Sequence, residues 1–398
     1  MTDKTKNPSR RLILKSSAAA GIALSGAGIW RANEQGLFSI GQGPAYDIWD
    51  LAPTPQPETV MLLQAAVLGA SPHNTQPWLF SLEGETITVW ADHPRHLGTM
   101  DPYLREMYIG LGCAIESARL LAASAGRDLS IEVIDAPLST STQRTKPVQV
   151  ARLTLKGSAS DTLNLAAQIP HRHTNRYPYL PDKPVPQSFL TWAVQIAGEM
   201  GVGLNLWADG FARQQINQLI VQATEAIVDD TEMAHDSAAW TRLSKSEIAT
   251  HRDGVTMESA GLSPGLFILS KMVPKVDAHT SHMYWLAATR DSHVPTAAMV
   301  GTISVGNLYS AKDSILAGRF WQHMHLGATK QGLAMHPLNQ PIEMIDRQRQ
   351  LGKAAPEASL LAGLIERPGH EPTFSFRIGY PTSAAQRSPR RAIDGLLI

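Results

Sequence analysis

Apolar and polar positions along this chain follow two different periods, one typical of helices and one typical of strands. Apolar residues three or four positions apart predict helices at 59–69, 102–125, 186–200, 211–234, 310–329 and 357–365. Alternating runs predict strands at 79–82, 86–90, 129–134, 148–155, 203–207 and 373–380, with a further β-branched apolar run at 296–305. Because helices and strands do not alternate regularly, the pattern favours an α+β fold over a doubly wound sheet.

Three segments fall outside this periodic pattern. Residues 33–57 hold several Gly and Pro and are predicted to form a linker or an arm wrapped on the body. Residues 332–337 are predicted to be a loop. Residues 236–295 have weak periodicity and many polar, Gly and Pro positions, so we expect an insertion that acts as a lid over a site.

Residues 1 to about 32 are predicted to be an export signal and are set apart from the fold. Residues 9–15 fit the twin-arginine pattern, and the apolar, uncharged residues 16–29 are too short for a membrane span of ~20 residues. A buried helix with a basic flank is the alternative. Because the twin-arginine route exports folded proteins, we expect a periplasmic or otherwise extracytoplasmic protein that takes up its cofactor before export.

Charge and cysteine content narrow the possible classes of protein. The chain has 35 basic and 35 acidic residues, so its formal net charge gives no electrostatic reason to expect nucleic acid or an anionic membrane as a partner. Cys113 is the only cysteine, which rules out an intramolecular disulfide. It lies in an apolar helical pattern and is predicted to be a small core residue.

Two polar motifs carry the candidate chemistry. Residues 73–78 (HNTQPW) form a polar turn directly after an apolar helical pattern, and residues 172–177 (RHTNRY) place two guanidiniums close to a hydroxyl and an amide. A buried phosphomonoester needs fixed cations together with hydroxyl or amide donors, and Arg172, Thr174 and Arg176 supply that set. A solvated basic turn is the alternative.

Both motifs resemble the flavin-binding motifs of the nitroreductase superfamily, and this resemblance implies FMN as the cofactor. It implies that Arg172 and Thr174 hold the FMN phosphate and that Arg176 lies near the ribityl chain or the pyrimidine edge. Residues 71–78 are similar to the loop that faces the flavin across the subunit interface in that family. The cofactor-binding residues implied by the two motifs are Ser71, His73, Asn74, Gln76, Arg172, His173, Thr174 and Arg176.

Two further stretches resemble parts of the same family. Residues 332–337 (GLAMHP) resemble its Gly-Leu turn, whose backbone approaches the reactive edge of the flavin ring. Residues 377–381, followed by 388–391, resemble the C-terminal strand and basic patch that complete the phosphate pocket. The resemblance therefore adds Gly332, Leu333, Ala334, Arg390 and Arg391 to the implied cofactor-binding residues. It implies no metal and no catalytic side chain, because the chemistry belongs to the flavin.

The chain departs from ordinary members of the superfamily, which are about half as long and build two identical sites at a dimer interface. Its first half, 59–156, has the 71–78 loop but no counterpart of the 172–177 motif. Its second half, 170–398, has the 172–177 motif but no counterpart of the 71–78 loop. We therefore predict an intrachain pseudo-dimer of two non-identical nitroreductase-like halves, a monomer with one flavin site. This arrangement is similar to the single-chain, Acg-type branch of the superfamily.

The resemblance implies an FMN-dependent oxidoreductase that passes electrons through flavin N5 to a nitro compound, a quinone or a similar small acceptor. Its donor would be NAD(P)H or a so far unidentified reductant, since soluble NAD(P)H is scarce outside the cytoplasm. The alternative is a flavin-sequestering protein whose lid, residues 236–295, blocks turnover. A folded scaffold that has lost its flavin is a third interpretation.

Three other interpretations, a hydrolase, a zinc site and a dinucleotide-binding fold, each lack a sequence feature that they require. Residues 261–265 (GLSPG) match the nucleophile elbow of hydrolases, but Pro264 has no N–H to serve as the oxyanion donor that follows the serine. The histidine pairs at 171/173, 279/282 and 323/325 lack a recognised zinc pattern. No G-x-G-x-x-G follows a predicted strand, which disfavours a dinucleotide-binding fold.

Overall fold

The computed structural model describes residues 26–50, 57–140, 144–160, 162–273 and 276–398. The twin-arginine stretch and most of the apolar part of the predicted export signal lie outside the described residues. Residues 26–34, where the signal is predicted to end, are helical. None of the helices in the described ranges combines the length and the apolar character that crossing a bilayer requires.

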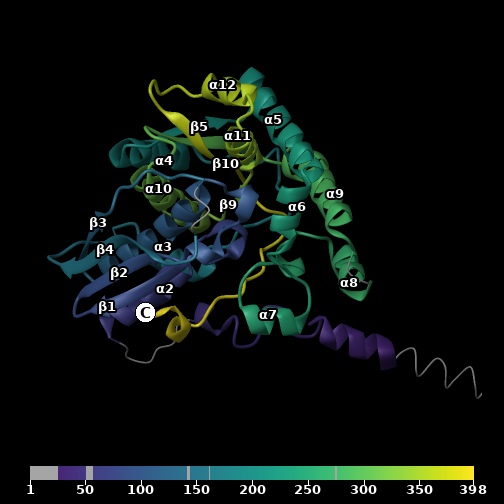
Figure 1. Ribbon diagram of the computed structural model, residues 1–398, viewed down its shortest axis with the longest axis horizontal. Coiled ribbons are helices and arrows are strands. Elements are labelled where there is room, and N and C mark those ends of the chain that lie inside the picture. Colours follow the sequence, from purple (N-terminus) through teal and green to yellow (C-terminus); the bar gives the residue numbers. More distant parts are fainter. Residues whose placement is uncertain (1–25, 51–56, 141–143, 161, 274–275) are drawn as a thin grey trace, which may run out of the picture.

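The first half of the chain forms an antiparallel sheet covered by two helices (Figure 1). Its strands are β1 (Trp78–Glu83), β2 (Thr86–Ala91), β3 (Asp128–Val133) and β4 (Val148–Lys156), in the order β1-β2-β4-β3. Its helices are α2 (Glu58–Val67), which precedes β1, and α3 (Arg105–Ser124), which connects β2 to β3. The tight hairpin between β1 and β2 turns at Gly84, whose φ of 59° suits glycine.

The second half repeats this topology. Its strands are β5 (Gly203–Trp207), β8 (Met299–Val305), β9 (Ala334–Pro337) and β10 (Glu371–Gly379), in the order β5-β8-β10-β9. Helix α4 (Gln187–Met200) precedes β5, and α10 (Ala311–Lys330) connects β8 to β9. Strand for strand and helix for helix, the order matches that of the first half. The α+β class is thus confirmed, and the two halves are related by an internal topological repeat.

The central helices α3 and α10 hold the two halves together by packing against each other at two glycines (Figure 1). A Cβ placed on Gly112 would overlap the carbonyl oxygen of Ile315, and one placed on Gly318 would overlap the carbonyl oxygen of Ile109. The two close approaches are reciprocal, as expected for two related helices that cross. Cys113 lies at this crossing and is buried, as predicted, with its thiol directed at the Gly318 carbonyl at 3.3 Å.

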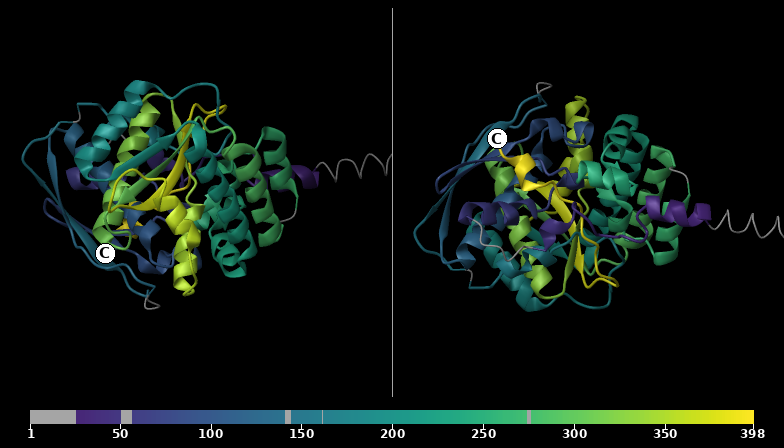
Figure 2. Two further views of the ribbon diagram at one scale, coloured as in Figure 1. Left: turned by 90° about the horizontal axis from the view of Figure 1, so that it is seen from above. Right: turned by 90° about the horizontal axis from the view of Figure 1, so that it is seen from below.

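A large helical segment stands between β5 and β8, where the first half has only the hairpin turn. It comprises α5 (Gly210–Asp229), α6 (Thr231–Ala238), β6 (Thr241–Arg242), α7 (Lys245–His251), β7 (Val255–Thr256), α8 (Pro264–Met272), α9 (Ala278–Ala288) and a π-turn, η7 (Thr289–His293). We refer to residues 208–298 as the insertion. The predicted lid, 236–295, is the later part of it. These helices form one side of the molecule (Figure 2).

Three local predictions are corrected by tertiary context. The helix predicted at 211–234 breaks at Asp230, which leaves the helical conformation and caps α6 by accepting from the Glu232 and Met233 amides. The segment 332–337 was predicted to be a loop, but it contains strand β9, which pairs with β10. Helix α11 (Gln340–Gln350) was not predicted, because Glu343, Asp346 and Arg347 are buried in it and mask its apolar face.

Helix α11 meets α3 at two buried carboxyl groups. Burial raises the pKa of Glu106 to about 7, and burial beside Glu106 raises the pKa of Glu343 well above its ordinary value. Asn339 donates a side-chain hydrogen bond to Glu106. The folded protein therefore holds protons on this pair that the unfolded chain releases from about pH 4.5 upward. Stability should fall as the pH rises through this window.

We expect Glu343→Gln to flatten this pH dependence. The amide N–H can replace the acid proton as a donor to Glu106, but it does not titrate. The midpoint of thermal unfolding, followed by calorimetry between about pH 5 and pH 9, should decline with pH more steeply in the wild type than in the variant. Parallel curves for the two proteins would contradict the assignment of this titration to the carboxyl pair.

Candidate functional site

The loop after α2 has a strained backbone, which its hydrogen bonds maintain. His73, Asn74 and Gln76 adopt positive φ angles of 45°, 55° and 50°. Such angles are uncommon for residues other than glycine, and they persist where surrounding contacts fix them. The loop begins with Ser71, whose hydroxyl accepts a hydrogen bond from the Gln76 amide at 3.0 Å. The polar turn predicted from the sequence is therefore a rigid, preorganised element.

Asn74 and Gln76 connect this loop to the C-terminal segment. The Asn74 side-chain oxygen accepts from Arg390 Nη1 at 2.6 Å, and the Asn74 amide donates to the Pro389 carbonyl at 3.0 Å. The Gln76 side-chain oxygen accepts from the Arg391 amide at 2.8 Å, and its main-chain carbonyl accepts from Arg391 Nη1 at 3.0 Å. The 71–78 loop of the first half thus meets the basic patch of the second.

Arg172 and Arg390 are buried beneath this loop without a counter-ion. They are 2% and 3% exposed, and no ion pair joins either guanidinium within the described ranges. Arg172 Nη2 donates to the Leu68 carbonyl at 3.1 Å, whereas its Nε and Nη1 and the Nε of Arg390 have no partner among the described residues. Burial lowers the pKa of Arg172 to about 10. Burial, followed by repulsion from Arg172, lowers the pKa of Arg390 well below its usual range.

Aromatic rings and neutral histidines surround these two guanidiniums. The guanidinium of Arg390 lies 4.7 Å from the centroid of the Trp49 ring, which itself contacts the ring of His173 at 4.6 Å. Burial, and secondly the charge of Arg172, lowers the pKa of His173 to about 3. His325 is buried nearby, and its Nδ1 has no partner in the described part of the chain. The result is an electropositive, buried cluster with spare hydrogen-bond donors.

A second pair of guanidiniums lies around the other end of the 172–177 motif. Arg176 Nη1 donates to the Ser259 carbonyl at 3.1 Å, and Arg377 Nη2 donates to the Tyr177 carbonyl at 2.9 Å. Arg377 Nε also donates to His336 Nδ1 at 3.1 Å. Burial lowers the pKa of each arginine to about 10. Burial, and then the charge of Arg377, keeps the pKa of His336 well below its ordinary value.

The remaining predicted residues lie at the edges of these two clusters. Gly332 ends α10 with a φ of 72°, Leu333 is buried, and Ala334 opens β9. The next residue in β9 accepts a hydrogen bond from the Asn175 amide at 3.2 Å, so the turn adjoins the 172–177 motif. Thr174 is half-buried between the two arginines of the motif. The structure therefore brings all four sequence stretches into one region.

The insertion covers the same region. The ring Nε2 of His73 lies 3.0 Å from the Ser237 hydroxyl, and the Gly254 amide donates to the Asn74 carbonyl at 3.2 Å. Gly261 packs directly against the backbone of Arg176 and Tyr177, with no room for a Cβ. Burial, and then the charge of Arg176, lowers the pKa of His73 to about 4. This loop histidine is therefore neutral at physiological pH.

Sequence reasoning missed several residues of the site. Trp49 comes from the arm that was predicted only as a linker, and its indole N–H donates to the Ser388 carbonyl at 2.7 Å. His325 was considered only as half of a histidine pair, and Arg377 only as part of the stretch 377–381, so neither was predicted to be a cofactor-binding residue. The sequence could have indicated Trp49, because a large aromatic residue in an arm of this kind often packs against the body of the protein.

Comparison with known proteins places this chain near nitroreductases. No known family model matches it. Over 187 residues, 47% of its length, it is 28% identical to "Putative NAD(P)H nitroreductase Rv3131" of Mycobacterium tuberculosis H37Rv and to "Putative NAD(P)H nitroreductase MT3217" of strain CDC 1551. The chain spans about half the length of these curated relatives, 52% of each.

Solved structures with some likeness to the chain carry similar names. The FMN-dependent nitroreductase NfnB from Mycobacterium smegmatis, in complex with NADPH, is 16% identical, covers 59% of this chain and 97% of its own, and has a TM-score of 0.35. A nitroreductase-like protein from Anabaena variabilis is 10% identical, with 74% and 69% coverage and a TM-score of 0.37.

Proposed function

We propose that this protein is an FMN-binding oxidoreductase of nitroreductase type, with one flavin site built between the two halves of one chain. The observation that carries the proposal is the pair Arg172 and Arg390, two buried guanidiniums with unused N–H groups and no carboxylate partner among the described residues. Burying such charges is costly unless an anion compensates them. A phosphate monoester is the anion that this donor set suits best.

The donors fit a mononucleotide in more than one place. The free N–H groups of Arg172 and Arg390, with the hydroxyl of the half-buried Thr174 from the same motif, would hold the phosphate. Arg176 and Arg377 would face the more distant polar edge of the ligand, where their positive field favours negative charge. The relatives named as nitroreductases, and the FMN named for the M. smegmatis protein, agree with this interpretation.

Bound FMN supplies electron and hydride exchange through N5 of its ring. The chain's own residues bind, orient and shield. The rigid loop of Asn74 and Gln76 fixes one wall, and the insertion lies over it and excludes water. The neutral His73 and His336 can donate or accept one hydrogen bond each without adding charge. No side chain is required as a nucleophile.

We propose NAD(P)H or another reductant as donor, and a nitro compound, a quinone or a similar small molecule as acceptor. The names of the relatives support the nicotinamide donor. The twin-arginine pattern supports export of the folded, flavin-loaded protein to the periplasm or another extracytoplasmic compartment. The internal repeat supports a monomeric pseudo-dimer.

A flavin-sequestering function is the second candidate, and one observation favours it. The insertion is bonded to the site loop in several places: Gln76 Nε2 donates to the Arg252 carbonyl at 2.9 Å, and Asn74 Nδ2 donates to the Gly254 carbonyl at 3.2 Å. The neighbouring Asp253 pairs with Arg242 at 2.9 Å. A lid held in this way would restrict access to a flavin beneath it.

One titration tests the proposal and separates its two forms. We expect the purified protein to be yellow and to release FMN on boiling. Dithionite is added to one anaerobic sample and NADPH to another, and the flavin absorbance of each is followed. Bleaching by both reagents supports the oxidoreductase, and bleaching by dithionite alone supports sequestration. A colourless protein that cannot be reconstituted with FMN would refute both.

A further inference from the structure

The helices α8 and α9 of the insertion expose many large apolar side chains. Leu266 and Leu269 of α8 are each 56% exposed. The same stretch of chain also exposes Ile268, Val273, Val276, Met283 and Tyr284. Exposed large apolar side chains that gather in one part of a soluble protein often mark a binding surface. We refer to these seven residues, with Ile29 and Trp30, as the apolar face.

Charge is nearly absent from the α8 part of this face. Residues 259–276 contain no Asp or Glu, and their charged residues are Lys271 and Lys275. Lys271, in the middle of α8, is buried, and its ammonium contacts Glu258 at 2.7 Å and the Leu243 carbonyl at 2.7 Å. Because the cation is compensated inside the protein, covering the outside of α8 would desolvate little charge. An apolar phase is therefore the environment that this surface suits.

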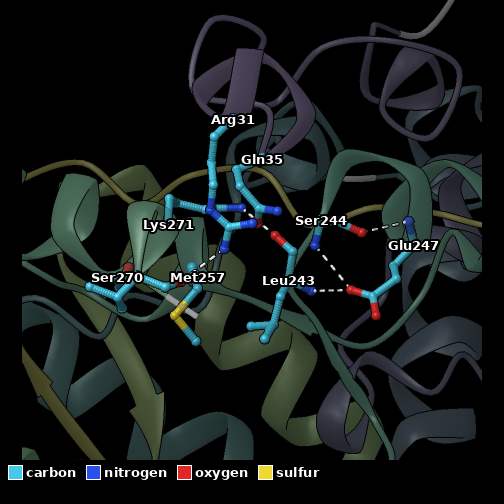
Figure 3. A pocket seen from close by; sticks show the side chains of 9 residues that line it. Arg31, Gln35, Leu243, Ser244, Glu247, Met257, Ser270 and Lys271 are labelled. Atoms are coloured by element: carbon cyan, nitrogen blue, oxygen red, sulfur yellow. Dashed lines mark hydrogen bonds between the residues drawn. The ribbon is translucent and has the colours of Figure 1, made fainter. Parts of the chain in front are cut away.

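The N-terminal helix, residues 26–34, is attached to the same place. Arg31, which lies beside Lys271 and Gln35 in Figure 3, donates from Nε to the Met272 carbonyl at 3.1 Å and from Nη2 to the Val273 carbonyl at 3.0 Å, at the end of α8. Its side chain borders a cavity of about 390 Å³ that also touches Gln35 and Lys271. Ile29 and Trp30 are 63% and 64% exposed. They precede Arg31 in the same helix, which is bonded to the end of α8.

We propose that the apolar face docks on the surface of a lipid bilayer. The proposal concerns the full chain, which still carries the predicted export signal, and the occupant is indicated by the part of that signal that precedes the apolar face. Residues 16–29 form the apolar, uncharged stretch directly before Trp30, and the N-terminal helix leaves the molecule on the side of α7 and α8 (Figures 1 and 2). The last residues of this stretch belong to the N-terminal helix, and Ile29 there is part of the apolar face.

The length of the preceding apolar stretch and the aromatic residues of the face favour a bilayer over a second copy of the chain. The stretch 16–29 is shorter than the ~20 residues that span a membrane, so its own binding to lipid would be weak. Docking of the apolar face would add a second contact with the same bilayer and strengthen the binding. Trp and Tyr prefer the boundary between lipid and water, and the face has Trp30 and Tyr284. A second copy would cover the face but would leave the preceding apolar stretch in water.

A fluorescent label on α8 tests the docking surface directly. Cys113, the only cysteine, is buried, so Leu269→Cys in the full chain gives a single accessible thiol for a polarity-sensitive dye. We expect blue-shifted emission on addition of vesicles of phosphatidylethanolamine and phosphatidylglycerol. Phe211→Cys is the matched control, since Phe211 is 73% exposed at the start of α5, away from α8 (Figure 1). Its label should not respond.

A double substitution measures the contribution to affinity. Leu266→Glu with Leu269→Glu should weaken vesicle binding roughly tenfold or more, because two exposed leucines no longer enter the lipid. Leu360→Glu, on an exposed position elsewhere, should leave binding unchanged. A silent label at position 269, or unaltered affinity of the double variant, would overturn the proposal. Blue-shifted emission from this label in the absence of vesicles, together with a doubled molecular mass, would also overturn the proposal, because it would assign the face to a second copy of the chain.

Discussion

Gly318→Ala should destabilise the protein by about 3 kcal/mol or more, the largest effect we expect from a single methyl group. The added Cβ would overlap the carbonyl oxygen of Ile109, where α10 crosses α3. A backbone atom cannot rotate away as a side chain can, so the two helices must separate. Thermal unfolding should shift downward by roughly 4 °C or more in calorimetry.

The reciprocal crossing provides a second variant and a control. Gly112→Ala should have a similar effect, because its Cβ would overlap the carbonyl oxygen of Ile315. Gly198, in α4, is also helical, but a Cβ added to it would meet no heavy atom within 4 Å. Gly198→Ala should therefore stabilise by up to ~1 kcal/mol through helix propensity. Equal effects at all three glycines would show that helix packing does not depend on this crossing.

Arg172→Met should change stability in opposite directions with and without FMN. The FMN-free protein should gain about 1–3 kcal/mol, because a buried guanidinium without a counter-ion is replaced by an apolar side chain of similar length. FMN affinity should fall by roughly 1.5–3 kcal/mol, about 10- to 150-fold, because a charge-assisted phosphate contact is lost. Unfolding of both forms and a fluorescence titration with FMN measure the two effects.

A buried arginine with satisfied hydrogen bonds serves as the control. Arg213 is buried and donates to the carbonyls of Trp207, Val294 and Ala297 at 3.0 to 3.2 Å. Arg213→Met should destabilise the protein with and without FMN and leave FMN affinity unchanged. If Arg172→Met behaves in the same way as Arg213→Met, then Arg172 is a structural residue and the proposed phosphate subsite is wrong.

The prediction of individual elements succeeded where local signals are strong. The β1–β2 hairpin was predicted within about a residue, because alternating strands flank a turn at Gly84. Helix α4 was predicted to follow Pro186, and it does, because proline suits the entry to a helix. Strand β9 and helix α11 were missed, since β9 depends on pairing with β10 and α11 buries charged groups against other elements.

The candidate site was predictable in its parts but not in its assembly. The sequence indicated two polar motifs and two supporting stretches, and the structure brings these together. It did not indicate that Arg390 would donate to Asn74, or that Arg172 would lack a counter-ion among the described residues. It also gave no sign that Trp49, from the arm, would lie against the guanidinium of Arg390. These contacts join residues far apart in the chain, and local periodicity contains no information about them.

By itself the sequence determined the α+β composition, the approximate bounds of most strands and helices outside the insertion and the residue types that suit a phosphate-bearing cofactor, because hydrogen bonding, propensity and charge act over a few neighbouring positions. Only the tertiary structure decided how the halves meet. The reciprocal approach of Gly112 and Gly318 sets the distance between α3 and α10, and that distance places the first-half loop beside the second-half arginines. Packing of backbone against backbone is a property of the whole fold, so no single segment could specify it.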